Sequence, residues 1–327
     1  MRGLSDAFLD DLNGGCLEYL LSAVKADDNL CLEIREDYLN IYYRGGNLYC
    51  IKKDNKKESQ YDFFFDKNYH KHKGSMLSNF SDAIFDKLIS CEDYVKYIPV
   101  LKTEIDLWFN EHPKYEREYQ QLVLRENSYS GSDKSGNGVS KDTDYFVVDI
   151  EYATRANGSR VDIEYAPRAN GSRFDMVAVK WLSTSLQRRN SQNASLALIE
   201  MKYADAAHDG TAGIVKHFED IRRFVSDGKI NALCDETENV FNQKLKLGLI
   251  KGIDKELKLN RETKPEFIIL AANHKPEKTV FKRELEKAIA QFPELAQSID
   301  IKIATASNMG YGLYANYMIR LEDFLKG

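Results

Sequence analysis

The spacing of apolar residues changes along the chain and predicts two regions. A helix is predicted over 8–24, and short alternating apolar runs then predict an antiparallel sheet between about 29 and 66, with a tight turn at 44–47. From about residue 80 the spacing becomes helical, with an interruption at His112-Pro113. Because proline suits the first turn of a helix, we predict that a new helix begins near Pro113 and runs to about Glu126.

The remaining chain alternates predicted strands and helices. After the helix at 113–126 we expect a strand in each of two repeat copies, 148–160 and 161–173, and then strands near 174–182, 195–203, 267–272, 299–305 and 312–321, with helices at 211–226, 234–250 and 279–296. This mixture predicts an α/β (α+β mixed) core. We therefore expect an accessory or regulatory sheet-and-helix region over 1–112 and a second domain over 113–327.

A 13-residue segment occurs twice in succession, because residues 148–160 recur as 161–173 with Pro167 in place of Thr154. Two short copies do not make a solenoid. Each copy reads as a strand followed by an Asn-Gly turn. The first copy continues an apolar run from Tyr145, whereas the second leads directly into Phe174, so the pattern leaves open which copy forms the core strand.

Composition and charge narrow the class of protein. The 327 residues are 43% hydrophobic and 30% charged, which allows a substantial core and excludes a disordered chain. There is no run of about 18 apolar residues as a membrane span requires, and early acids such as Asp10 argue against a secretory leader. Five scattered cysteines without a CxxC pair favour a reducing, cytoplasmic location. The formal charge of -5 provides no overall positive field for nucleic acid, although a local carboxylate cluster can matter more than the total.

The hairpin formed by 174–182 and 195–203 carries the candidate chemistry. Pairing the two strands across their loop places Asp175 opposite Lys202 and Val177 opposite Glu200. Because side chains alternate along a strand, Glu200 and Lys202 share one face. The pattern therefore predicts two carboxylates and one lysine at one end of an apolar sheet.

These residue types suit metal-assisted hydrolysis. Asp175 and Glu200 are hard oxygen ligands for Mg²⁺ or Mn²⁺, and the carbonyl of Met201 is a candidate third ligand. Lys202 would stabilise developing charge or orient the attacking water. An acid-x-Lys string alone is not specific, since it recurs at Glu256–Lys258. The alternative is a purely structural Glu–Lys–Asp cluster, because charges in apolar strands are costly unless they are paired or functional.

Asp175 followed by Glu200-Met201-Lys202 resembles the D…(D/E)xK signature of the PD-(D/E)XK, or restriction-endonuclease-like, nuclease superfamily, with Phe174 at the usual proline position. The order of the predicted elements over about 113–305 is similar to the αβββαβ core of that family.

The resemblance implies that Asp175 and Glu200 bind the metal and that Lys202 serves the water. In many relatives a glutamate from the first helix joins the metal, and Glu118 is the candidate here. Lys216 and His217, on the helix after the ExK strand, would contact DNA phosphates. A solvated helix face is the alternative for that pair.

We therefore expect a metal-dependent endonuclease that uses Mg²⁺, or Mn²⁺ as a substitute, and acts on DNA, with no membrane partner. Cutting both strands would favour a homodimer. The alternative is a catalytically inactive nuclease fold that serves as a nucleic-acid-binding or protein-assembly module, and RNA is the other substrate to consider. His208 and the arginines at 188–189 are secondary candidates for contacts near the site or with phosphate, and we expect Glu151 to face solvent.

Overall fold

The computed structural model describes residues 1–54, 61–75, 90–128, 143–153, 172–188, 190–204, 210, 213–250, 253, 255–273, 279–306, 313 and 315–326. The chain divides into two compact units. Unit 1 comprises Met1–Gln121 and Asn239–Asp254, and unit 2 comprises Leu122–Glu238 and Lys255–Gly327. The predicted division at 112/113 lies close to the first of these boundaries, which falls within a helix, α5 (Tyr115–Asn127).

Unit 1 is built on a four-stranded antiparallel sheet in the order β1-β2-β3-β4, as the alternating pattern predicts. Its strands are β1 (Leu30–Ile34), β2 (Tyr38–Tyr43), β3 (Gly46–Lys53) and β4 (Tyr61–Phe64). Its helices are α1 (Asp6–Gly14), α2 (Glu18–Ala26) and α4 (Cys91–Glu111), with the 3-10 turn η1 (Lys67–His70) and the C-terminal part of α8 (Ile230–Lys246).

Three local sequence signals explain how unit 1 is connected. The single helix predicted over 8–24 is two helices, because the glycine pair Gly14-Gly15 ends the first of them. The turn between β2 and β3 places Arg44 and Gly45 at positive φ, 50° and 76°, as a two-residue hairpin turn requires. Helix α4 begins at Ser90, whose side chain and that of Asp93 cap each other's backbone N–H groups.

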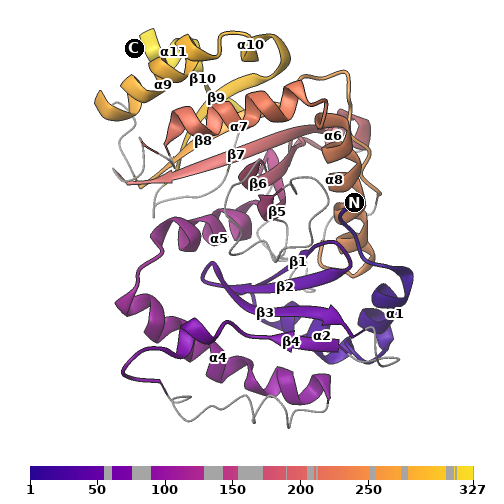
Figure 1. Cartoon of the computed structure of the whole chain (residues 1–327). Coiled ribbons are helices and arrows are strands. Elements are labelled where there is room, and N and C mark those ends of the chain that lie inside the picture. Colours follow the sequence, from indigo (N-terminus) through magenta and orange to yellow (C-terminus); the bar gives the residue numbers. More distant parts are fainter. Residues whose placement is uncertain are drawn as a thin grey trace. The chain divides into compact units, whose positions relative to one another are not determined.

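Unit 2 contains a six-stranded mixed sheet in the order β10-β9-β8-β7-β6-β5 (Figure 1). Its strands are β5 (Tyr145–Ala153), β6 (Arg173–Lys180), β7 (Ser195–Tyr203), β8 (Glu266–Ala272), β9 (Asp300–Ala306) and β10 (Ile319–Arg320). Strands β5, β6 and β7 are antiparallel neighbours, β7, β8 and β9 run parallel, and β10 is antiparallel to β9. The predicted mixed α/β class is therefore confirmed.

The helices of unit 2 are α6 (Ser185–Arg188), α7 (Ile214–Ser226), α9 (Thr279–Gln291), α10 (Leu295–Ser298) and α11 (Leu321–Lys326), with 3-10 turns η2 (Ser191–Asn193) and η4 (Ala315–Tyr317). Helix α7 lies along the sheet (Figure 1), where the ring of Phe218 meets that of Phe267 on β8 with centroids 5.5 Å apart. Both rings are fully buried, and each contributes roughly 1.5–3 kcal/mol by leaving water.

The structure differs from the predicted elements at the C-terminal end. The helix predicted over 279–296 is two helices, α9 and α10, because Pro293 lies between them and cannot continue a helix. The strand predicted over 312–321 is largely wrong: within the described residues only β10 is extended, and α11 begins at Leu321.

The first copy of the repeat supplies the core strand, since β5 includes residues 148–153. Residues 154–171 lie outside the described part of the chain. The pairing of β5 with β6 shifts between Val147 and Asp149, so Val148 forms a bulge, and both Val148 and Asp149 are buried.

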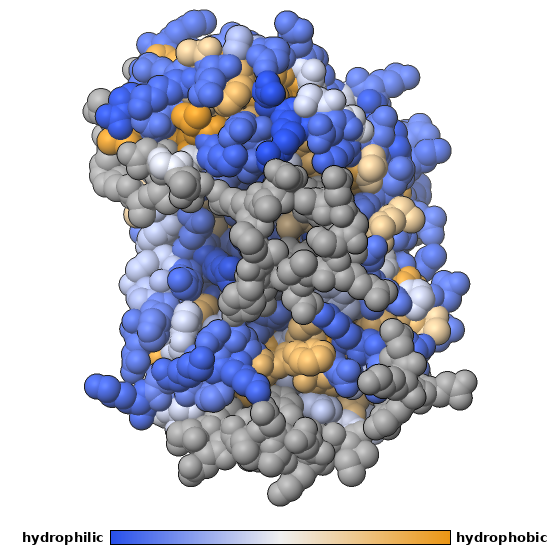
Figure 2. All heavy atoms as spheres, viewed as in Figure 1, coloured by the Kyte–Doolittle hydropathy of each residue, from blue (hydrophilic) through white to orange (hydrophobic). Residues whose placement is uncertain are grey.

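The surface in the view of Figure 2 is mainly hydrophilic, and its hydrophobic residues occur in small separate patches. The large apolar side chains that are exposed in the described residues include Leu186 and Val280, and folded proteins commonly expose side chains of this kind. None of the described helices has the length and apolar character needed to cross a bilayer.

Candidate functional site

The candidate residues lie on two paired strands, in a register different from the predicted one. Val177 of β6 faces Leu198 of β7, and Met176 faces Ile199. Continuing this register by one residue places Asp175 opposite Glu200, so the predicted pairs Asp175–Lys202 and Val177–Glu200 are wrong by two positions. The difference arises at the connection between the strands, where the chain leaves β6 directly after Lys180.

A shift of two residues leaves every side chain on its predicted face. Glu200 and Lys202 therefore still share one face of β7, with Asp175 on the neighbouring strand. Residues directly opposite in an antiparallel pair have Cβ atoms roughly 4.5–5.5 Å apart. The observed pairing of β6 with β7 ends at Met176–Ile199, so the close approach of the Asp175 and Glu200 carboxylates stays a prediction.

Glu200 and Lys202 form a buried cluster with a histidine from another element. Lys202 Nζ lies 2.9 Å from Glu200 Oε1, and His217 Nε2 lies 2.9 Å from the same oxygen. The third side of this triangle, from Lys202 Nζ to His217 Nε2, is 3.0 Å. Only 2% of the Glu200 and Lys202 side chains and 7% of the His217 side chain are exposed.

The cluster keeps a carboxylate charged inside the protein. Burial by itself raises the pKa of Glu200, but the adjacent His217 and Lys202 outweigh it and lower that pKa to about 2. Glu200 is therefore ionised at neutral pH. His217 Nε2 either donates to Glu200 or accepts from Lys202, according to which ring nitrogen carries the proton.

Asp175 is half-buried and is held by the strand that carries Glu200. Its Oδ2 accepts a hydrogen bond from the backbone N–H of Met201 at 2.8 Å. This contact ties the Asp175 carboxylate to the strand position between Glu200 and Lys202. The role of the Met201 carbonyl as a metal ligand stays a prediction.

Backbone strain concentrates at the same end of the sheet. In the described part of unit 2, the non-glycine residues with positive φ are Glu151 at 52°, Ala204 at 51° and Asn273 at 50°. Glu151 lies near the end of β5, and Ala204 and Asn273 directly follow β7 and β8. A left-handed conformation costs a non-glycine residue of the order of 1–2 kcal/mol, and such strain clusters at functional sites.

The sequence pattern predicts that Glu151 faces solvent, but the structure places it differently. It is half-buried, and its Oε2 accepts from Arg173 Nη2 at 2.7 Å. Glu151 lies between Ile150 and Tyr152, which pair with Met176 and Phe174 of β6. This ion pair therefore joins the two ends of the connection that contains the second copy of the repeat.

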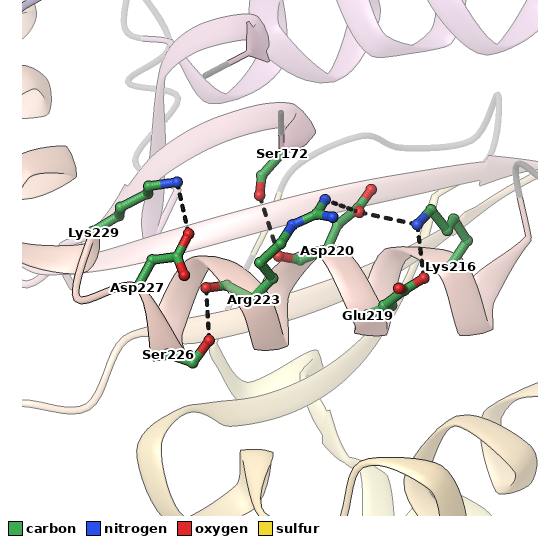
Figure 3. A network of polar contacts seen from close by, with 8 residues as sticks. All are labelled: Ser172, Lys216, Glu219, Asp220, Arg223, Ser226, Asp227 and Lys229. Atoms are coloured by element: carbon green, nitrogen blue, oxygen red, sulfur yellow. Dashed lines mark hydrogen bonds and ion pairs between the residues drawn. The ribbon is translucent and has the colours of Figure 1, made fainter. Parts of the chain in front are cut away.

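The other predicted site residues are placed differently. Lys216 is 30% exposed and pairs with Glu219 at 2.7 Å and with Asp220 at 3.6 Å. Figure 3 shows these contacts along α7, together with Arg223, whose Nη2 lies 2.7 Å from Asp220 Oδ1. Lys216 thus remains on the accessible side of the helix, as its predicted phosphate contact requires.

His217 has the opposite placement, because its side chain is buried in the cluster with Glu200 and Lys202. A signal for this was present in the sequence. Ile214, Phe218 and Ile221 have helical spacing and form the buried stripe of α7, and His217 belongs to the same stripe.

Glu118 belongs to unit 1, whereas Asp175, Glu200 and Lys202 belong to unit 2. Its carboxylate is ion-paired with Arg44, with Oε1 2.8 Å from Nη2. Arg44 also pairs with Asp106 of α4, so it connects two helices to the β2–β3 turn. His208 and Arg189, and the side chain of Arg188, lie outside the described residues.

Two carboxylates, Asp175 and Glu200, are the donors that this part of the sheet could offer a divalent cation. Within the described ranges, no three His, Cys, Asp or Glu side chains gather in a metal-binding group. Mg²⁺ is commonly held by one or two carboxylates and keeps several waters. That Asp175 and Glu200 supply such carboxylates stays a prediction. Comparisons of the chain with protein-family models, with curated proteins and with solved structures found no match.

Proposed function

We propose that this chain is a metal-dependent nuclease of the PD-(D/E)XK type that hydrolyses phosphodiester bonds in DNA. The observation that carries the proposal is the fully buried Lys202, ion-paired to Glu200 at the carboxyl end of β7, with Asp175 on the adjacent strand. Burying a lysine and a carboxylate costs several kcal/mol per ion before their attraction is counted. A catalytic role gives this arrangement a reason to exist.

The order of elements supports the same proposal. Helix α5, the antiparallel strands β5, β6 and β7, helix α7 and strand β8 follow one another in the αβββαβ order of the restriction-endonuclease-like core, with α8 inserted before β8. The parallel pairing of β8 with β7 places their carboxyl ends together. Ends of parallel strands are common ligand sites in sheets with this arrangement.

Each residue then has a defined task. Asp175 and Glu200 supply anionic oxygens to Mg²⁺, or to Mn²⁺ as a substitute, and Met201 orients Asp175 through its N–H. The cation, when bound, polarises the scissile phosphate and lowers the pKa of its water. The Lys202 ammonium provides donors for the developing charge on the phosphate oxygens or for the attacking water.

Lys216 is the proposed phosphate contact outside the catalytic cluster, because its ammonium group is accessible and can exchange its surface partner Glu219 for a phosphate. His217 is not part of this DNA contact, since it is buried. Glu118 is left out of the proposed metal site, because its carboxylate serves Arg44.

The test is cleavage of plasmid and single-stranded DNA in Mg²⁺, Mn²⁺ or EDTA. The wild-type protein is compared with Lys202→Met and Asp175→Asn. Lys287→Met is the matched control, because Lys287 is an exposed lysine of α9 that pairs only with Glu284 among its described contacts. We expect metal-dependent cleavage that is lost in the first two variants and kept in the control.

Two results would contradict the proposal. Cleavage that survives both substitutions would mean that the activity belongs to another site or another protein. A folded wild-type protein that binds DNA without cutting it in any metal would favour the alternative of an inactive nuclease fold used for binding or assembly. An RNA substrate in the same assay distinguishes the two nucleic acids.

A further inference from the structure

His217 is the residue that joins helix α7 to the Glu200–Lys202 pair. Its Nε2 lies 2.9 Å from Glu200 Oε1 and 3.0 Å from Lys202 Nζ, so one ring atom contacts both members. The other two residues belong to β7, and His217 reaches them from a different element, α7. The geometry of the pair therefore depends on how α7 packs against the sheet.

That packing is tight around the histidine. Its neighbours Ile214 and Phe218 are fully buried, and the Phe218 ring meets Phe267 of β8. The backbone N–H of His217 bonds to the carbonyl of Gly213, which fixes it in the first turn of α7. An imidazole has few rotatable bonds, so a packed helix presents Nε2 at a defined position.

The two contacts of the Glu200 carboxylate fall on the same atom. Within the described residues, Lys202 and His217 both approach Oε1. The terminal torsion of a glutamate is broad, so its carboxylate plane is poorly defined unless partners hold it. Two partners at Oε1 define that plane and direct Oε2 away from them.

We propose that His217 is a positioning residue that holds the Glu200 carboxylate and the Lys202 ammonium in register, so that Oε2 of Glu200 is presented to the divalent cation. The inference rests on the proposed nuclease function for its consequence, but the positioning itself is a property of the chain. Partners that orient a metal-binding carboxylate in this way typically change metal affinity or activity by about 10–100-fold when they are removed.

The test compares three variants of the full chain. His217→Leu removes the ring nitrogens and keeps an apolar side chain on the buried stripe, whereas His217→Gln keeps an amide that can reach Oε1. Glu219→Gln, on the exposed side of the same helix, is the control. The measurements are Mn²⁺ affinity by calorimetry and crystal structures of each variant without metal.

We expect the Glu200–Lys202 contact to persist in the wild-type protein, in Glu219→Gln and in His217→Gln, and to be lost or divided among conformers in His217→Leu. Mn²⁺ affinity should fall by about 10–100-fold in His217→Leu and recover most of this loss in His217→Gln. If His217→Leu does not fold, His217→Asn, whose amide is too short to reach Oε1, takes its place.

An unchanged Glu200–Lys202 geometry together with unchanged Mn²⁺ affinity in His217→Leu would overturn the inference. Equal loss of thermal stability in His217→Leu and His217→Gln, with Mn²⁺ affinity intact in both, would show that His217 serves packing alone. Failure of the wild-type protein to bind Mn²⁺ would instead count against the proposed nuclease function, and the metal-free structures would still decide whether His217 positions the pair.

Discussion

The ionised Glu200 should make the stability of unit 2 depend on pH in a way that one substitution removes. Its ordinary pKa of 4.5 falls to about 2 in the folded protein, where burial is outweighed by His217 and Lys202. At about 1.4 kcal/mol per pH unit, this difference corresponds to roughly 3 kcal/mol. Because the folded pKa is the lower one, the stabilisation is complete well above pH 4.5 and is lost as the pH falls toward 2.

The substitution Glu200→Gln keeps the shape of the side chain and removes the titration. Linkage predicts that the advantage of the wild-type protein over Glu200→Gln shrinks by about 2 kcal/mol between pH 6 and pH 3. Other carboxylates titrate in both proteins and cancel in the comparison. The control is Glu219→Gln, because the Glu219 carboxylate is about half exposed and should change the pH dependence much less.

The assay is urea unfolding in EDTA at pH 6 and pH 3. Unit 2 must be followed separately, since two compact units need not unfold together. The chain has two tryptophans, and a Trp108→Phe background leaves the buried Trp181 of unit 2 as the fluorescent reporter. A difference between wild type and Glu200→Gln that stays constant from pH 6 to pH 3 would refute the assignment of Glu200 as a carboxylate held by Lys202 and His217.

Three further predictions follow from the site and its connections. Asp175→Asn should cost under about 1 kcal/mol of folding stability, measured by urea unfolding, because the amide oxygen still accepts from Met201 N–H. The same substitution should lower Mn²⁺ affinity more than about tenfold, measured by calorimetry. An unchanged Mn²⁺ affinity would contradict the role of Asp175 as a metal ligand. Deleting residues 154–166 shortens the β5–β6 connection from 19 residues (154–172) to 6 (167–172). Because the entropic cost of closing a loop falls as the loop becomes shorter, this deletion should stabilise unit 2 by about 1 kcal/mol, and loss of folding would mean that the second copy is structurally required. Glu118→Gln should weaken the ion pair with Arg44 and lower the folding stability by about 1 kcal/mol or less, while Mn²⁺ affinity stays unchanged. A large loss of Mn²⁺ affinity would restore Glu118 as a candidate metal ligand.

Local patterns in the sequence predicted much of the fold because burial imposes a local period. The alternation in β1, β2 and β3 and the apolar runs of β6, β7 and β8 predicted those strands, and the spacing of Ile214, Phe218 and Ile221 predicted α7. The interruptions within helices were less well predicted, because there a glycine or proline competes with a continuous helical spacing of apolar residues. The glycines at the end of α1 and the proline after α9 divided helices that periodicity alone would join.

In the candidate site too, some features follow from local sequence patterns and others do not. Placing Asp175, Glu200 and Lys202 at one end of paired strands needed only the period of two along a strand and the existence of the hairpin, both of which are written in consecutive residues. A register error of two residues did not disturb this placement, because it preserves the faces. The residue types, and the face that Glu200 and Lys202 share, were therefore determined by the sequence.

The partners of those side chains were decided by the tertiary structure. His217 lies 15 residues from Lys202 in the chain, and their contact depends on the angle and depth at which α7 packs on the sheet. The choice between the two repeat copies likewise depended on which one pairs with β6, a comparison of nearly identical local sequences. Local periodicity states which side of an element is buried, whereas the identity of the neighbour depends on contacts between segments that are distant in sequence, and only the packed fold brings those segments together.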